Sequence, residues 1–152
     1  MKHRFLLDEN ILHHGIKGVD RHNNRDLAAT TFLRLIGANC HSIVLNPELL
    51  RRYNTQLRRL SRERTPILQP EWFIRELLHN SAKRSLEYDD PPELPADVAI
   101  PEEDKSIVRA ALISHPIVVA NDENLVEAIN GHPSLELRAL YAVEAIVPAS
   151  ES

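Results

Sequence analysis

The sequence has one cysteine, four glycines and few aromatic residues. Cys40 alone can form neither an internal disulfide nor a zinc site built from several thiolates, so nothing indicates an oxidising compartment. The N-terminal segment has only a three-residue apolar run before its first acid, and no run approaches the roughly 18 apolar residues of a membrane span. We therefore expect a soluble, cytoplasmic protein without a signal peptide or a contact with membranes.

Several common motifs are also missing. The sequence contains no GxGxxG, Walker loop or GxSxG, which disfavours dinucleotide binding, P-loop chemistry and serine hydrolysis. It has no HExxH or CxxC, and His13 and His14 are adjacent rather than at metal-ligand spacing. The histidines are therefore predicted to be surface residues.

The size and charge of the chain limit the remaining classes. With 152 residues, 43% of them hydrophobic, residues 1–152 should form a single domain around one core. The net charge of -4 and the isoelectric point near 6.1 argue against a generally basic nucleic-acid coat. They leave room for a local basic patch.

Apolar patterning predicts alternating strands and helices. The apolar runs at 4–7, 42–45 and 117–120 are typical of strands buried on both faces. Helices are predicted at about 28–36, 47–62, 70–78, 101–112 and 122–130. The signals are helical spacing of apolar residues, proline or asparagine at a helix start, and glycine at a helix end. Residues 81–100 should form a long connection containing a short strand or a functional flap, and 135–143 a half-exposed edge strand.

This alternation predicts an α/β fold: a parallel sheet of about four to five strands with helices on both faces, in three layers. Ligands of such sheets bind outside the carboxyl ends of the strands. The polar residues that follow each apolar run are therefore the first candidates for a functional site.

Three carboxylates are expected at that edge. Asp8 ends the first strand, Asp122 follows the strand at 117–120, and Asp104 opens the helix that leads into that strand. Gathered carboxylates repel one another unless a cation neutralises them. Mg²⁺ or Mn²⁺ prefers such oxygen ligands and can activate water for phosphodiester cleavage.

Each of these residues also has a structural interpretation. Asp8 can simply cap the next helix, and Glu102 and Glu103 suit a helix start as well as Asp104 does. The supporting polar residues Asn10, Asn121 and Asn124 can orient carboxylates or water, or act as caps.

A second feature is the segment RRYNTQLRRLSRER, with six arginines in fourteen residues. On a helical wheel, five of them share one face opposite a leucine and tyrosine stripe: Arg51, Arg52, Arg58, Arg59 and Arg62. Guanidinium groups pair well with phosphate, so this face is a candidate RNA-binding surface. The alternative is a solvated face paired with the acidic stretch 87–104, which has eight acids and no base.

Three stretches together resemble the PIN domains, a class of metal-dependent ribonucleases. One family motif is an apolar strand followed by Asp, any residue and Asn. In FLLDENIL, Asp8 and Asn10 match it. The family's acid followed by an aliphatic pair matches Asp104 in PEEDKSIVRAAL, and its strand-end Asp matches Asp122 in IVVANDENLV. The start of the chain is also similar to a PIN-related group of small bacterial proteins, with the same expected architecture.

The resemblance implies an endoribonuclease that binds Mg²⁺ or Mn²⁺ through Asp8, Asp104 and Asp122, acts on RNA and is of the toxin type, with an antitoxin-like protein partner. Two positions depart from the family. Arg52 stands where a further Glu is usual, and Ala120 replaces a hydroxyl residue. Glu48, one turn before Arg52, is a candidate substitute ligand, but the helix dipole explains an acid there equally well.

Three functional hypotheses therefore remain open. The first is a metal-dependent ribonuclease. The second is a catalytically degenerate PIN-like domain that binds RNA or a protein without cutting, because Arg52 interrupts the acidic set. The third is a structural subunit whose charged segments form an interface, and the sequence leaves homodimerisation open.

Overall fold

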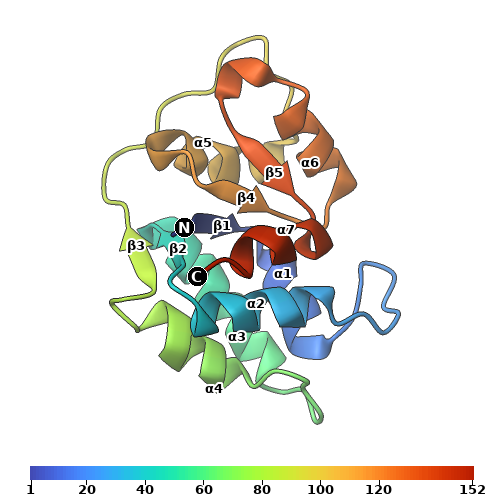
Figure 1. The fold of residues 1–152 in the computed structure, drawn as a ribbon. Coiled ribbons are helices and arrows are strands. Elements are labelled where there is room, and N and C mark those ends of the chain that lie inside the picture. The colour runs from blue at the N-terminus through green and yellow to red at the C-terminus, as the bar shows by residue number, and fades with distance from the viewer.

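The computed structural model describes residues 1–152, which fold around a five-stranded sheet in the order β3-β2-β1-β4-β5 with all neighbours parallel (Figure 1). The strands are β1 (Arg4–Leu7), β2 (Ser42–Leu45), β3 (Arg84–Leu86), β4 (Ile117–Val119) and β5 (Arg138–Leu140). The predicted α/β fold with a parallel sheet of four to five strands is confirmed.

Helices cover both faces of this sheet. The larger ones are α1 (Glu9–Lys17), α2 (Ala28–Ala38), α3 (Pro47–Leu60), α5 (Lys105–Ser114), α6 (Glu123–Asn130) and α7 (Ala142–Ala149). The shorter ones are α4 (Pro70–Phe73), its π-helical continuation η1 (Ile74–Leu78), and the 3₁₀ turns η2 (Glu102–Asp104) and η3 (Pro133–Leu135). α5 and α6 lie on one side and the other α-helices on the opposite side (Figure 1), which gives the predicted three layers.

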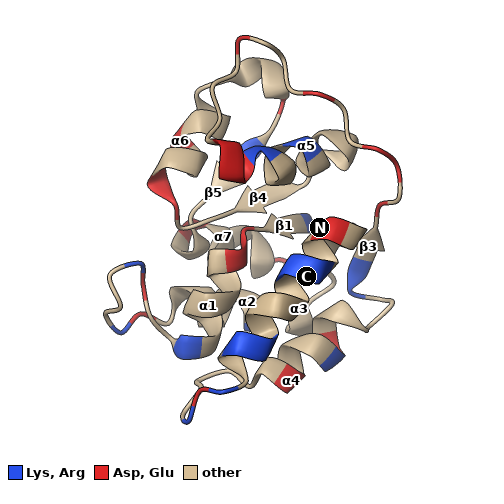
Figure 2. Cartoon of the chain, turned by 180° about the vertical axis from the view of Figure 1, so that it is seen from behind, with Lys and Arg blue, Asp and Glu red and all other residues tan.

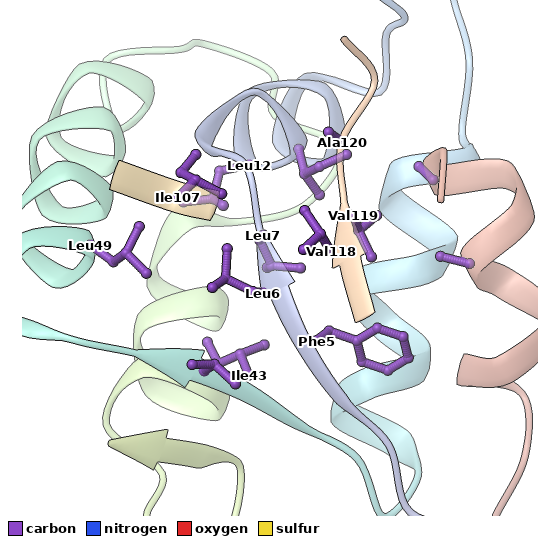
Figure 3. Close-up of a cluster of buried hydrophobic side chains, with 14 of the residues drawn as sticks. Phe5, Leu6, Leu7, Leu12, Ile43, Leu49, Ile107, Val118, Val119 and Ala120 are labelled. Carbon is purple, nitrogen blue, oxygen red and sulfur yellow. The ribbon is translucent and has the colours of Figure 1, made fainter. Parts of the chain in front are cut away.

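The three apolar runs form the central strands because both of their faces are covered. Phe5, Leu6 and Leu7 of β1 have no exposed surface. Figure 3 shows them among side chains from the neighbouring strands and helices. They belong to one cluster of 38 buried hydrophobic residues, and the burial of such side chains stabilises the fold by about 1.5 to 3 kcal/mol each.

Two of the three predicted proline helix starts are confirmed; the exception is Pro101, which precedes the 3₁₀ turn η2, while α5 begins only at Lys105. Pro47 is the first residue of α3, and the Asn46 side chain accepts a hydrogen bond from the Leu49 amide. Pro70 likewise begins α4. These confirmed positions depend on local chemistry, because the first helical residue needs no amide donor and the preceding side chain can cap.

The predicted edge strand at 135–143 is largely wrong. Only Arg138–Leu140 pairs with the sheet, while Pro133–Leu135 forms a 3₁₀ turn and Ala142 begins α7. In α7 the buried residues include Ala142, Ala145 and Ala149. Their helical spacing follows directly on the strand-like alternation, so the two patterns merge in the sequence.

The connection after β3 does not cover the arginine-rich helix. It runs on the α5 side of the sheet, where Figure 2 shows its acidic positions. Val98 and Ile100 are buried, and Arg109 of α5 donates hydrogen bonds to the carbonyls of Pro91 and Pro92. The chain at 87–101 is therefore held against α5.

The strand order reverses between β1 and β4: β2 and β3 are added on one side of β1, and β4 and β5 on the other. β1 and β4 are hydrogen-bonded neighbours, and the Asp8 amide donates to the Val119 carbonyl at 2.9 Å. A crevice at such a reversal point is the usual ligand site of an open parallel sheet. No helix in the structure is both long enough and apolar enough to cross a membrane.

Candidate functional site

The three candidate carboxylates come from three separate segments around this reversal point. Asp8 follows β1, Asp122 follows β4 and caps α6, and Asp104 ends η2 just before α5. Asp8 is only 4% exposed and Asp104 only 6%. Two of the acids therefore lie in the interior rather than on the solvated edge.

Helix capping does not explain the two buried acids. Asp8 and Asp104 occupy N-cap positions, yet neither side chain makes a capping hydrogen bond. Asp122 differs, because its Oδ1 accepts from the amides of Asn124 and Leu125 at 3.0 and 3.4 Å. Capping is thus a role of Asp122 but not of Asp8 or Asp104.

Burial disfavours the charged form of both Asp8 and Asp104. Burial raises the pKa of Asp8 to about 7, and the charges of Asp104, Glu9 and Asp122 act in the same direction. The pKa of Asp104 is also raised, first by burial and then by Asp122. Oδ2 of Asp104 is sealed from solvent and has no hydrogen-bond partner, which is costly for a buried polar atom.

The positive charge of Arg52 acts on Asp8 and Asp104. Arg52 donates to Glu9 Oε1 at 2.6 Å and to Ser106 Oγ at 2.7 Å, so it links α3 to α1 and α5. Burial by itself would lower its pKa, but the hydrogen bond and charge of Glu9 raise it overall. Arg52 also opposes the upward shift in the Asp104 pKa.

An open cavity of about 930 Å³ is lined by Asp122 and by Glu9, the neighbour of Asp8, whereas Asp8 and Asp104 themselves are not part of its lining. Its lining consists of polar and charged residues alone: Glu9, Asn10, His13, His14, Arg21, Arg51, Arg52, Thr55, Gln56, Arg59, Asn121, Asp122, Glu123 and Asn124. Four arginines and three acids therefore face one space. A polar cavity of this kind suits a hydrated, charged ligand and not an apolar one.

The predicted basic face divides into two groups. Arg51, Arg52 and Arg59 line the cavity, whereas Arg58 and Arg62 do not. Only Arg52 of the five forms an ion pair, so the acidic stretch 87–104 does not neutralise this face. Glu48 lies exposed in the first turn of α3 and outside the cavity lining.

The prediction that the histidines are surface residues is wrong for His14 and His41. Both are buried, and His14 Nδ1 lies 2.9 Å from Asn121 Nδ2 in the cavity wall. Sequence reasoning missed His14, Arg21 and Glu9 as cavity residues. For His14 the available signal was its place beside the buried helix residues Ile11 and Gly15.

The donors suit a hard cation in kind. Carboxylate oxygens are the ligands that Mg²⁺ and Mn²⁺ prefer. The Asp104 Oδ2 atom has no hydrogen-bond partner in the protein, so it is free to coordinate a cation. The present placement of the donors is not a complete ligand set, because no group of three or more His, Cys, Asp or Glu side chains is arranged to hold a metal ion. The fit therefore rests on the chemistry of the donors and on the unpartnered oxygen.

The comparisons with known proteins yield a structural likeness. No protein-family model matches the sequence, and no curated protein matches it. Among solved structures, the chain is similar to a PilT N-terminus (PIN) domain protein from the hyperthermophilic archaeon Sulfolobus solfataricus P2. The likeness covers 98% of this chain and 95% of the other, with a TM-score of 0.48 and 11% identity.

Proposed function

We propose that this chain is a ribonuclease that uses Mg²⁺ or Mn²⁺ to hydrolyse phosphodiester bonds of RNA. The observation that supports this most is the pair of buried acids Asp8 and Asp104. Both have raised pKa values, and one carboxylate oxygen has no partner in the protein. A divalent cation would neutralise this cluster, and carboxylates with raised pKa values gather at functional sites.

The roles of the side chains follow from their positions. Asp8 and Asp104 would hold the cation, together with the Asp122 oxygen that does not cap α6. When bound, such a cation lowers the pKa of water and stabilises a leaving oxygen. Arg51 and Arg59 line the adjacent cavity, where their guanidinium groups would bind phosphates. Asn10 and Asn124 line the same space and offer hydrogen bonds to the ligand or its water.

The first experiment measures cleavage of a labelled single-stranded RNA with Mg²⁺ or Mn²⁺. Asp8→Asn and Asp104→Asn should abolish cleavage. Asp90→Asn is a matched control, because Asp90 is exposed on the segment 87–101, which is held against α5. Metal at a hundred times its dissociation constant should stabilise the wild type by about 2.7 kcal/mol. The proposal is wrong if wild-type protein shows neither cleavage nor metal-dependent stabilisation.

A second candidate function is RNA binding without cleavage. It is favoured by Arg52, whose positive charge lies beside the acids and is fixed by Glu9 and Ser106. It is also favoured by the lack of a complete ligand set. In this case Arg52 acts as a permanent counter-charge.

A pair of adjacent arginines tests whether RNA lies in the cavity, which both candidates require, and two further results separate the candidates. Arg59 lines the cavity and Arg58 does not, so Arg59→Glu should weaken RNA binding much more than Arg58→Glu. Under the second function, RNA binding persists in Asp8→Asn and wild-type protein never cleaves. Arg52→Glu should then create metal-dependent stabilisation that the wild type lacks, because it replaces the counter-charge with a fourth acid.

A further inference from the structure

The lining of the cavity indicates which part of an RNA strand it suits. None of its fourteen residues is aliphatic or carries a phenyl, phenol or indole ring. Proteins that hold unpaired bases usually stack them on aromatic rings, whereas phosphates are bound by guanidinium, amide and imidazole donors. The cavity therefore offers many donors for phosphate groups and lacks the Phe, Tyr and Trp rings on which bases stack most often.

Within this cavity, a chain of hydrogen bonds determines which nitrogen of His14 carries a proton. The first amide of α7, from Ala142, donates to Asn121 Oδ1 at 3.1 Å. The Asn121 amide nitrogen therefore faces His14 Nδ1, at 2.9 Å. An amide NH₂ can only donate, so Nδ1 must accept and the neutral ring carries its proton on Nε2.

The Nε2 proton is available to a ligand. His14 has no other side-chain hydrogen bond in the protein. The buried side-chain atoms that lack a partner are confined to Glu87 and Asp104, so His14 Nε2 is not sealed in the interior. His14 lines the cavity although it is only 6% exposed overall. The ring is thus held in place with one N–H group that is neither paired nor sealed from solvent, on a side chain that lines the cavity.

We propose that His14 binds the RNA backbone, donating its Nε2 proton in a hydrogen bond to a phosphate oxygen, and that Asn121 is the positioning residue that sets this tautomer. The inference rests on the proposed action on RNA and adds a neutral donor to the arginines. The neutral His14 ring thereby orients the phosphate through a directional hydrogen bond without adding charge to the cavity. Because the contact is to the backbone, its strength should not depend on base identity.

Two substitutions at His14 separate donor chemistry from packing. His14→Gln places an amide N–H near the position of Nε2, whereas the shorter His14→Asn keeps its amide near Nδ1 and does not reach that position. A hydrogen bond to a charged acceptor changes affinity by about tenfold or more. We expect His14→Asn to lose about tenfold in RNA affinity, and His14→Gln to recover most of it.

The assay is fluorescence polarisation with a labelled single-stranded oligonucleotide in EDTA, so that no cleavage occurs. Oligouridylate, oligoadenylate and an oligonucleotide with abasic positions should show the same loss. His79→Asn is the matched control, because His79 is exposed and lies outside the cavity lining. Unchanged affinity in His14→Asn, or a loss confined to one base, would overturn the inference.

A second variant pair tests the positioning role even if His14→Asn fails to fold. Asn121→Asp and Asn124→Asp add the same charge to the cavity, but only residue 121 contacts His14. A carboxylate at 121 accepts from Nδ1 and removes the proton from Nε2 when the ring is neutral. Asn121→Asp should therefore lose more RNA affinity than Asn124→Asp at alkaline pH.

Nitrogen-15 NMR of the histidine rings reads the tautomer without RNA. The expected result is protonation at Nε2 in the wild type and at Nδ1 in Asn121→Asp. Protonation at Nδ1 in the wild type would overturn the inference. If the wild type cleaves RNA and His14→Asn binds RNA as well as the wild type does, the role of His14 is refuted but the proposed function is not. A wild type that neither binds nor cleaves RNA would refute the proposed function as well.

Discussion

Replacing Asp8 by Asn should make the protein more stable at alkaline pH. Asp8 is 4% exposed, and its side chain makes no capping hydrogen bond that Asn would lose. Asn has nearly the same shape but no charge to bury. The substitution therefore removes the cost of an ionised carboxylate among Asp104, Glu9 and Asp122 and leaves the packing of β1 intact.

The size of the effect follows from the pKa. The pKa of Asp8 rises from 3.8 to about 7 on folding, a difference of about 3 units, and each unit corresponds to 1.36 kcal/mol. Because the folded pKa is raised, the folded state holds the proton more tightly than the unfolded state. The wild type should therefore lose up to about 4 kcal/mol of stability as the pH rises from 4 through 7.

The assay is urea unfolding of wild type and Asp8→Asn across this pH range. The two proteins should have similar stability near pH 4, and the variant should gain steadily up to about pH 7 before the difference levels off. Asp90→Asn, at an exposed position, should show no such trend. Saturating Mn²⁺ should stabilise only the wild type and so narrow the difference at alkaline pH.

Two results would refute this reasoning. The first is an Asp8→Asn protein less stable than the wild type at alkaline pH, which would mean that the carboxylate makes favourable interactions. The second is a stability difference that does not vary with pH, which would mean that Asp8 ionises in the folded protein as readily as in the unfolded chain. Either outcome would also weaken the case for a cation at this position.

Three further predictions concern neighbouring features. Tyr53→Phe should cost about 1 to 3 kcal/mol in urea unfolding, because the buried Tyr53 hydroxyl donates to the Leu7 carbonyl; an unchanged free energy of unfolding would contradict this. Arg109→Ala should make the chain at 91–97 more susceptible to limited proteolysis, because Arg109 binds the Pro91 and Pro92 carbonyls, while RNA binding at the distant cavity stays the same. Burial lowers the pKa of His41, so stability should fall as the pH drops below about 6.5, and His41→Asn should reduce that fall in a thermal unfolding series.

The elements that were predicted well share a local cause. Strands buried on both faces need uninterrupted apolar runs, and 4–7, 42–45 and 117–120 supply them. The starts of α3 and α4 follow from proline. The segment 135–143 failed because Leu135, Leu137 and Ala139 alternate as in a strand, while Pro148 lies inside α7 and argues against a helix.

The candidate site was predictable in part for a related reason. Acids that directly follow buried strands must lie at one edge of a parallel sheet, which made Asp8 and Asp122 candidates. The roles of Arg52 and His14 were not predictable, because each depends on residues distant in sequence. Arg52 bonds to Glu9 and Ser106, and His14 bonds to Asn121.

By itself, the sequence determined the apolar central strands, most of the helices between them and the presence of carboxylates at the strand ends, because these depend on neighbours within a few residues. It did not predict α1 or α7. Only the tertiary structure decided that β1 and β4 are adjacent, that Asp8 and Asp104 are buried near each other's charge, and that α3 presents Arg59 but not Arg58 to the cavity. Burial, pairing and pKa depend on the groups that surround a side chain in space, and the order of the strands sets those surroundings.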